Sequence, residues 1–586
     1  MNQQSNIKHQ KFPWLPTSKR EIEALGWTQP DVILFSGDAY VDHPSFGAAV
    51  IGRVLEADGF RVAIVPQPNW RDDLRDFRKL GVPRLFFGIS GGCMDSMVNH
   101  YTANKRLRSD DAYTPGNVAG FRPDYAVTVY SRILKKLYSD IPVIVGGIEA
   151  SLRRLTHYDY WQDQLKPSIL VESNADLLVY GMGEHVIRTI ARLMQNGKKI
   201  NELTGIPQTA YLTQSFGSLK MNEQDLLLHS FEDCVKSKRK FAENFCCIEV
   251  ESNKLNASRI IEPVGDKFVV VNPPEYRTDE KDIDIAFDLP YTRLPHPRYK
   301  GKIIPAFKMI QFSINIHRGC FGGCSFCTIS AHQGKFVASR SERSILNEVR
   351  HLTQMSDFKG YLSDLGGPSA NMFRMKGRNI SICDKCSRYS CIYPKLCTNL
   401  DIHHTPLLEL YRKVRNMEGI KKVCISSGIR YDLFMDSNGF LSCEHACYFN
   451  ELLQYHVSGR LKVAPEHCSQ HVLQAMRKPD FSIFIKMKEA FDRIDRSKNL
   501  RQQLTPYFIS SHPGCSEADM RQLSHTMQEM RFNRLEQAQD FTPTPMTLSS
   551  VMYYCGFDPY NGKKLHIARS KDEKMNQKKI LSASLF

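Results

Sequence analysis

The chain has 586 residues, of which 42% are apolar and 24% charged, which is the composition of a folded globular protein of two or three domains and excludes a mainly disordered chain. No apolar run approaches the ~18 residues of a membrane helix, and the first residues lack the regions of a secretory signal, so we expect a cytoplasmic protein with no membrane partner. The formal net charge of +16 suits an acidic partner such as nucleic acid, but the charge is spread along the chain and supports this only weakly.

Residues 1–30 are expected to form an N-terminal extension, and residues 31–200 alternate strand-like and helix-like segments as in an open parallel sheet. The predicted strands are Val32–Ser36, Arg61–Val65, Arg84–Ile89, Pro142–Val145 and Leu177–Tyr180. The predicted helices include Phe46–Asp58, Tyr125–Leu137 and Glu184–Asn196, with apolar residues at i, i+3 and i+4. Five such strands predict a flavodoxin-like domain. Glycine-bearing turns follow several of them and are either ligand-binding or ordinary tight turns.

Residues 201–300 mix charged stretches with short apolar runs, and we expect a connector with a small helical part and a β hairpin. Between residues 301 and 555 the βα alternation resumes, which predicts a partial (βα) TIM-like barrel. Its predicted strands are Ile310–Ile316, Tyr361–Leu365, Lys422–Ser426, Leu461–Ala464 and Leu504–Ile509, and its predicted helices lie at 341–355, 405–417, 469–477, 481–498 and 516–536. Residues 556–586 form a basic tail, predicted to be solvated and disordered, with an RNA- or anion-binding arm as the alternative.

Three cysteines, Cys320, Cys324 and Cys327, are spaced Cys-x3-Cys-x2-Cys on a glycine-rich loop directly after the first predicted barrel strand. Three thiolates on so short a loop suit an iron–sulfur cluster with one iron left open, because a cubane cluster takes four ligands. The alternatives are half of a zinc site or clustered core cysteines. With 17 cysteines and no secretory signal, the sequence favours metal ligation and reduced thiols over disulfides.

A second group, Cys383, Cys386, Cys391 and Cys397, falls in an insertion at about residues 370–400. Four thiolates within so few residues form a closed ligand set, suited to an auxiliary iron–sulfur cluster or to structural zinc. Reduced cysteines that bind no metal are the alternative.

The three-cysteine loop resembles that of radical S-adenosylmethionine (SAM) enzymes. The resemblance implies that Gly366 and Gly367 form the turn whose backbone accepts the methionine amino group of SAM, although Pro368 stands where the family often has Glu. It also implies that Ser426 and Ser427 hydrogen-bond the ribose or carboxylate, and that Glu466 belongs to a segment lying against the adenine. Loop residues that satisfy their own backbone are the alternative interpretation.

Five segments together resemble the YgiQ-like radical SAM proteins over nearly the whole chain: Leu289–Pro297, the cysteine loop, Asp364–Met372, Ser510–Cys515 and Gln539–Pro545. The N-terminal half resembles the cobalamin-binding-like domain that precedes the core in several radical SAM families. The cobalamin motif Asp-x-His-x-x-Gly is not kept, however, because Asp42 and His43 are adjacent and Gly47 lies four residues beyond the histidine. We therefore do not expect cobalamin here.

The resemblance implies a radical SAM enzyme that binds a [4Fe-4S] cluster and cleaves SAM reductively, with electrons from a flavodoxin- or ferredoxin-type donor. Its substrate is not identified by the sequence, and methylthiotransferase-like modification of RNA or protein is one option. Tyr507, His512 and Cys515 are candidate substrate-side groups. A non-catalytic iron–sulfur redox sensor or scaffold is the alternative function.

Overall fold

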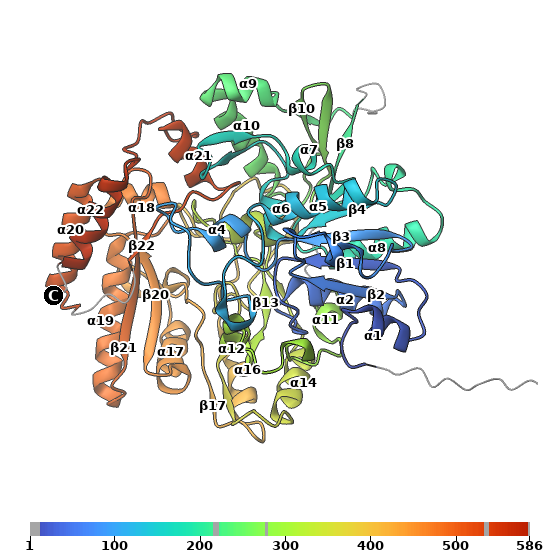
Figure 1. Cartoon of the computed structure of the whole chain (residues 1–586). Helices are drawn as coiled ribbons and strands as arrows, with labels where there is room; N and C mark the ends of the chain where they lie inside the picture. The colour runs from blue at the N-terminus through green and yellow to red at the C-terminus, as the bar shows by residue number, and fades with distance from the viewer. Residues whose placement is uncertain (1–11, 215–221, 276–278, 533–537, 584–586) are drawn as a thin grey trace, which may run out of the picture.

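The computed structural model describes residues 12–214, 222–275, 279–532 and 538–583. Residues 1–11 of the expected extension and residues 533–536 of the helix predicted at 516–536 lie outside the described residues. The dominant element is a nine-stranded sheet with the order β2-β1-β3-β4-β7-β8-β11-β10-β9 (Figure 1).

The first half of this sheet is parallel and confirms the five predicted N-terminal strands. These strands are β1 (Val32–Ser36), β2 (Val62–Pro66), β3 (Phe86–Ser90), β4 (Val143–Gly146) and β7 (Leu177–Val179). Their order is that of flavodoxin-like folds, and it reverses between β1 and β3. Open α/β sheets bind ligands beyond the carboxyl ends of their strands at such a reversal.

Alternate residues of the strands face two different cores, which explains their nearly continuous apolar sequences. Leu34 packs with helices α2 (Gly47–Ala57) and α8 (Glu184–Gln195) on one face of the sheet. Phe35 packs with α5 (Ala126–Leu137) on the other face. All three helices were predicted from their apolar periodicity.

The second half of the sheet comes from the segment expected to be a connector. It consists of β8 (Thr209–Thr213), β9 (Leu226–Leu227), β10 (Ile260–Val264) and β11 (Lys267–Val271). The expected hairpin is present as the antiparallel pair β10–β11, and β11 pairs in turn with β8. This part of the chain therefore continues the N-terminal sheet.

Short parallel strands build the second region, a partial barrel. They are β12 (Ser313–Asn315), β15 (Tyr361–Leu362), β16 (Asp364–Gly366), β17 (Lys422–Val423), β20 (Arg460–Glu466), β21 (Gln503–Ser510) and β22 (Ala538–Asp540). β12 pairs with β16, β15 with β17, β20 with β21, and β21 with β22, all parallel. A parallel bridge between Ile429 and Val463 joins the chain after β17 to β20.

Helices α14 (Glu342–Thr353), α16 (Thr405–Arg415), α19 (Phe481–Lys498) and α20 (Glu517–Glu529) share one core with these strands. The fold is thus α/β, a flavodoxin-like sheet followed by a partial barrel. In Figure 1 the N-terminal sheet lies on the right and β20–β22 on the left, with the middle of the chain between them.

The strand predicted at Ile310–Ile316 was wrong in its first half, because Pro305–Ile310 form helix α12. Pro305 occupies the first turn, where its missing N–H costs nothing and its fixed φ favours a helix. The strand begins only at Ser313. Its alternating pattern nevertheless identified the buried residues Ile314 and Ile316.

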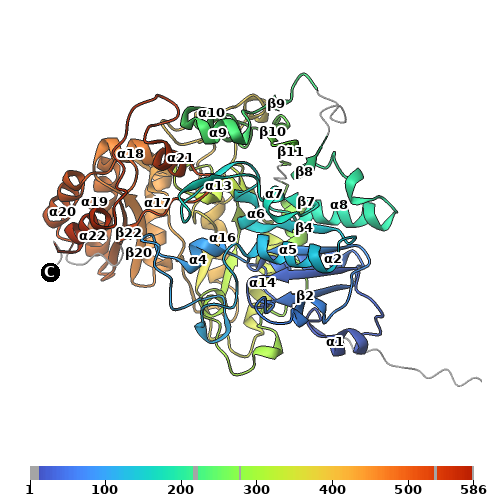
Figure 2. The same cartoon turned by 45° about the horizontal axis from the view of Figure 1, so that its top comes forward.

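The prediction of a disordered tail was also wrong. Helix α22 (Lys571–Ala583) packs beside α20 (Figure 2). Gln577 is buried, accepts a hydrogen bond from the Ser511 amide at 2.8 Å and donates one to the Cys515 carbonyl at 3.0 Å. Lys574 is buried as well and donates to the Tyr160 hydroxyl at 2.7 Å. The lysines suggested a solvated segment, but one of them serves as an interior hydrogen-bond donor.

Candidate active site

The three-cysteine loop is held in a tight conformation by its glycines. Gly319 has φ +83°, and a Cβ there would lie 2.3 Å from the Phe336 carbonyl oxygen. Gly323 has φ +63°, and a Cβ there would lie 2.7 Å from the Tyr389 carbonyl oxygen. Both positions therefore require glycine, because a side chain would be strained and would collide with backbone.

The loop brings the thiols of Cys320, Cys324 and Cys327 close enough to influence one another. Burial, together with the neighbouring thiols Cys324 and Cys320, raises the pKa of the Cys327 thiol to about 12. Burial likewise raises the pKa of Cys320, whereas the Arg430 guanidinium lowers it. A bound metal would stabilise the thiolates of these buried, neighbouring cysteines, because the thiolate is the form that binds metal.

The donor set suits a cubane cluster rather than a single ion. Among the described residues, no three His, Cys, Asp or Glu side chains surround one metal-ion position. A cubane binds each thiolate to a different iron, so its three sulfurs need not converge on one point. Cys320, Cys324 and Cys327 would be its protein ligands.

Arg430, which sequence reasoning did not single out, lies at the centre of the site. Its Nη1 donates to the Cys324 Sγ at 3.2 Å, and its Nη2 is 2.5 Å from Asp432 Oδ2. The side chain is buried. The only sequence signal was its position at the end of the Ser426–Arg430 turn, because the fold alone brings it to a cysteine 106 residues earlier.

The four turn residues predicted to contact SAM come together after β16 and β17. A Cβ on Gly366 would lie 2.8 Å from Ser427 Oγ, so the two turns touch. Asp364 joins them: its Oδ1 accepts from the Ser426 amide at 2.8 Å, and its carboxylate accepts from the Ser427 hydroxyl. Gly367 packs on the His317 ring, where a Cβ would lie 2.5 Å from Cε1. Both glycines leave room for close contacts that an alanine would block.

Glu466 lies beside the same loop. It is buried, has φ +70°, and its charge raises the pKa of Cys327. Lys478 Nζ is 3.8 Å from its carboxylate. Burial raises the pKa of Glu466, whereas Lys478 and Arg430 lower it. Gly367 and Glu466 thus lie beside the cysteine loop and its preceding residue His317, whereas Ser426 and Ser427 contact Asp364 and the Gly366 turn.

Of the candidate substrate-side groups, Tyr507 lies on β21, and His512 and Cys515 follow that strand; His512 Nε2 lies 3.5 Å from Ser325 Oγ of the cysteine loop. His512 Nε2 is 2.7 Å from Ser549 Oγ and its ring lies against Phe326. Cys515 is buried, with its Sγ 3.5 Å from His467 Nε2. Neither side chain lines any of the cavities described below.

The second cysteine group packs directly against the first. The Cys391 amide donates to the Phe321 carbonyl at 3.1 Å, and Ser390 Oγ donates to the Gly322 carbonyl at 2.8 Å. Burial raises the pKa of Cys391 to about 11, Lys335 lowers it, and the thiols Cys397 and Cys386 raise it. Burial and the thiols Cys386 and Cys397 also raise the pKa of Cys383. These thiols thus lie close enough to influence one another, but among the described residues no three of them surround one metal-ion position.

A cavity of about 450 Å³ lies between the N-terminal sheet and the cysteine loop. The sheet contributes the carboxyl ends of β1, β3, β4 and β7, and α2 contributes its first turns. The barrel side contributes Asn315, His317, Arg318, Ile329, His332, Gln333 and Pro368. This is the sheet edge where the order reverses, as expected for a ligand site.

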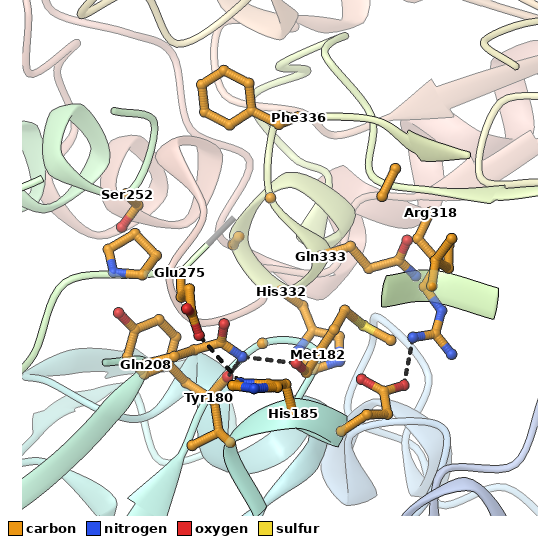
Figure 3. A pocket seen from close by; sticks show the side chains of 18 of the residues that line it. Tyr180, Met182, His185, Gln208, Ser252, Glu275, Arg318, His332, Gln333 and Phe336 are labelled. Carbon is orange, nitrogen blue, oxygen red and sulfur yellow. Dashed lines mark hydrogen bonds and ion pairs between the residues drawn. The ribbon is translucent and has the colours of Figure 1, made fainter. Parts of the chain in front are cut away.

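A smaller pocket of about 120 Å³ shares a wall with this cavity (Figure 3). Met182, His332 and Gln333 line both spaces, as does the ion pair of Arg318 with Glu184. In Figure 3 the four labelled side chains Met182, Arg318, His332 and Gln333 lie together, opposite Ser252 and Glu275. These side chains therefore stand between the two spaces.

The residues present do not fit cobalamin through the usual histidine. The His43 ring is buried, its Nδ1 accepts from the Ser45 amide at 3.1 Å, and it does not line the cavity. Asp42 is paired with Arg53 at 2.5 Å instead of supporting an imidazole. Absence of cobalamin stays a prediction, and no step below uses it.

Comparison with known proteins places this architecture in a class. Residues 14–313, just over half of the chain, match the family described as Radical SAM N-terminal. Together with the cysteine loop, this defines a radical SAM protein. UPF0313 proteins of Porphyromonas gingivalis and Bacteroides thetaiotaomicron are 60% and 59% identical over 97% of this chain, covering 90% and 93% of those proteins. The Escherichia coli protein YgiQ is 41% identical over 97% of this chain and 84% of its own length. The chain belongs to the UPF0313 family.

Two solved structures also align with this chain. TsrM, a radical SAM methyltransferase from Kitasatospora setae with cobalamin and a [4Fe-4S] cluster bound, aligns with a TM-score of 0.47 and 14% identity over 89% of this chain and 77% of its own. The cobalamin-dependent enzyme OxsB with aqua-cobalamin aligns with a TM-score of 0.47 and 10% identity over 96% and 57%. Likeness at this level does not extend to ligands or reaction. Within the described residues, no helix has both the length and the apolarity to cross a membrane.

Proposed function

We propose that the chain is a radical SAM enzyme, with Cys320, Cys324 and Cys327 as ligands of a [4Fe-4S] cluster and the turns at Gly366–Gly367 and Ser426–Ser427 as the SAM site. The observation that carries the proposal is convergence. The cysteine loop, both turns, Arg430 and Glu466 meet at one place, although they come from four separate parts of the chain.

The chain's own residues supply orientation, charge and exclusion of water. Arg430 offsets negative charge on the sulfurs, because its Nη1 already donates to Cys324. Asp364 fixes both turns through Ser426 and Ser427. Phe321 is buried beside the loop and keeps solvent from the sulfurs. A cluster held by these cysteines would pass on one electron from the donor, and SAM would then be cleaved to methionine and a 5′-deoxyadenosyl radical.

The proposal includes a reduced flavodoxin or ferredoxin as cytoplasmic electron donor, and a second metal held by Cys383, Cys386, Cys391 and Cys397. The hydrogen bond from the Cys391 amide to the Phe321 carbonyl supports a link between the two sites, since Phe321 adjoins Cys320. An iron–sulfur cluster there would relay electrons along this short connection. Zinc there would hold the insertion in place.

The test is an anaerobic comparison of the reconstituted wild type with the triple variant Cys320→Ala, Cys324→Ala, Cys327→Ala. Both are reduced, given SAM and assayed for 5′-deoxyadenosine by mass spectrometry, with iron, sulfide and zinc counted per chain. We expect deoxyadenosine from the wild type alone, with metal left in the variant marking the second site. A fully loaded wild type that releases none would favour the iron–sulfur sensor.

A further inference from the structure

The insertion, residues 371–400, lies directly against the cysteine loop. Ser390 Oγ donates to the Gly322 carbonyl at 2.8 Å, and a Cβ on Gly323 would lie 2.7 Å from the Tyr389 carbonyl oxygen. The Cys391 amide donates to the Phe321 carbonyl at 3.1 Å. An electron that enters the protein through the insertion would therefore need to cross only this contact to reach the loop.

Two of the loop sulfurs border a space that is too small for another protein's cofactor. Cys324 and Cys327 line a cavity of about 40 Å³, which Tyr389 also borders. Such a volume holds a few water molecules. An electron carrier that approaches from this side must therefore dock on the surface of the protein and deliver its electron through the intervening residues.

The insertion is more basic than the chain as a whole. It holds six Lys and Arg residues and one acidic residue, Asp384, whereas the whole chain has 78 basic and 62 acidic residues. Arg374 is paired with Glu280 at 2.7 Å. Four of the other cations are exposed and form no ion pair with any residue that the structure describes, namely Lys376, Arg378, Lys385 and Lys395. Exposed cations without ion-pair partners attract an acidic partner and guide its approach.

Two of these cations lie beside a short helix of the insertion, α15 (Ile380–Asp384). Gly377 stands between Lys376 and Arg378, and a Cβ on it would lie 2.4 Å from the Sγ of Cys383 in α15. The stretch that carries the two cations is therefore packed against the helix and against the second cysteine group.

The same helix exposes two large aliphatic side chains. Ile380 is 60% and Ile382 is 54% exposed. Apolar groups among charged ones are typical of protein interfaces, which combine an apolar centre with a polar rim. Single-stranded nucleic acid is bound instead through aromatic rings that stack on bases, and the Tyr389 ring is already covered by Arg477, whose guanidinium carbon lies 3.4 Å from its centroid. The insertion therefore fits an acidic protein better than RNA.

We propose that the insertion is the docking surface for the electron donor, and that this donor is a flavodoxin, a small acidic protein whose flavin exposes an apolar ring edge. Ile380 and Ile382 contact this edge, and the carboxylates around it pair with Lys376, Arg378, Lys385 and Lys395. One electron leaves the reduced flavin and enters the cysteine-bound cluster, so the flavin is oxidised and the cluster reduced by one electron each. The need for a donor rests on the proposed function, but docking can be measured without turnover.

Docking is tested by calorimetry on the anaerobically reconstituted full chain with a purified bacterial flavodoxin. We expect one flavodoxin per chain, with an affinity that falls on the order of tenfold between about 50 and about 300 mM NaCl, because salt screens exposed charges. Binding that is absent, or that does not respond to salt, would overturn the proposal.

Charge reversal locates the surface. The double variant Lys376→Glu, Arg378→Glu should lose roughly tenfold or more in flavodoxin affinity at low salt. The matched control is Arg496→Glu, Lys498→Glu, which reverses two exposed charges near the end of α19, outside the insertion. An equal loss in both double variants would mean that overall charge alone attracts the flavodoxin, and the insertion would lose its assigned role.

The kind of partner is tested separately. The double variant Ile380→Ser, Ile382→Ser should weaken flavodoxin binding by roughly tenfold and leave its salt dependence unchanged, because only apolar contact is removed. A ferredoxin of similar negative charge and a single-stranded RNA of about 20 nucleotides should both bind more weakly than the flavodoxin at about 150 mM NaCl. Tighter binding of either would assign the surface to that partner and contradict the flavodoxin assignment.

Electron delivery separates this proposal from the enzyme proposal. Deoxyadenosine is measured for the wild type and for Lys376→Glu, Arg378→Glu with two reductants. One is flavodoxin, kept reduced by NADPH and its reductase at a concentration below the wild-type Kd, and the other is dithionite, which needs no protein interface. The variant should lose roughly tenfold with flavodoxin and stay within about twofold of the wild type with dithionite.

An equal loss with both reductants would overturn the docking proposal, because the substitutions would then act on the reaction site itself. A wild type that binds flavodoxin at the insertion but releases no deoxyadenosine with either reductant would end the enzyme proposal and keep the docking surface. Deoxyadenosine release with dithionite, without flavodoxin binding, would keep the enzyme and end the docking proposal.

Discussion

The N-terminal sheet and the barrel use their buried charges in different ways. At the carboxyl edge of the sheet, Arg122 forms ion pairs with Asp38 at 2.9 Å and with Asp111 at 3.1 Å, so all three charges are paired inside the protein. In the barrel, Arg430 binds Asp432 with one part of its guanidinium and turns the other toward the Cys324 sulfur. The sheet therefore provides a rigid, apolar wall, and the barrel provides the reactive groups.

Strand length differs most within the barrel. β1, β2 and β3 of the sheet have five residues each, whereas β15 and β17, next to the predicted SAM turns, have two and β20 and β21 have seven and eight. The barrel side of the site thus depends on loops fixed by hydrogen bonds such as those of Asp364. Mutations in the sheet should mainly affect stability, and mutations in the barrel should mainly affect cluster and SAM chemistry.

The largest effect should come from breaking the charge network of the sheet. Arg122→Met leaves Asp38 and Asp111 buried without their cation, which should lower the free energy of unfolding by about 3–5 kcal/mol. Urea unfolding followed by circular dichroism measures this, with Arg106→Met at an exposed position as control. A loss below about 1 kcal/mol would show that water reaches this network and that the edge is not rigid.

A somewhat smaller effect concerns pH and again belongs to the sheet. Burial raises the pKa of Glu262, on β10, from 4.5 to about 7, although the Thr156 amide hydrogen bond lowers it. The folded state therefore holds this proton more tightly than the unfolded state. Its contribution to stability is complete below pH 4.5 and is lost as the pH rises toward 7, by about 3 kcal/mol at most.

Glu262→Gln should accordingly be more stable than the wild type at pH 8, and the difference should shrink as the pH falls toward 5. Thermal unfolding at pH 5, 6, 7 and 8 measures it, with Glu223→Gln, at an exposed position, as control. A constant difference between wild type and Glu262→Gln at all four pH values would mean that Glu262 is ionised throughout.

The same contrast explains what the sequence could predict. The strands of the sheet could be predicted because each, such as Val32–Ser36, is a nearly continuous apolar run. The metal-binding role of the cysteine loop could be predicted because its three cysteines lie close together in the sequence. Arg430 was not singled out, since its role depends on the cysteine loop that the fold brings near it. The tail was misjudged because hydrogen bonding inside the protein, not composition, decides the state of Lys574 and Gln577.

In the barrel, the largest effect outside the cysteines should follow Arg430→Lys. Lysine keeps the charge but cannot bridge Asp432 and the Cys324 sulfur in the same geometry. We expect deoxyadenosine formation to fall about 10- to 100-fold, as for other partners of metal ligands, with weaker iron retention on desalting. Arg496→Lys, on the exposed face of α19, is the control. Unchanged iron retention and rate would remove Arg430 from the cluster site and leave it a structural role.

The smallest effect should come from Ser427→Ala. This change removes the hydroxyl that donates to Asp364, but the Ser426 and Ser427 amides still donate to Asp364 Oδ1 at 2.8 and 3.1 Å, so the turn should keep its shape. Loss of one such hydrogen bond, about 1 kcal/mol, should raise the KM for SAM roughly fivefold with little change in kcat. Ser437→Ala, at an exposed position outside both turns, is the control. An unchanged KM in Ser427→Ala would mean that the turn acts only through its backbone, whereas a fall in kcat for Ser427→Ala would place Asp364 in the chemistry and not merely in binding.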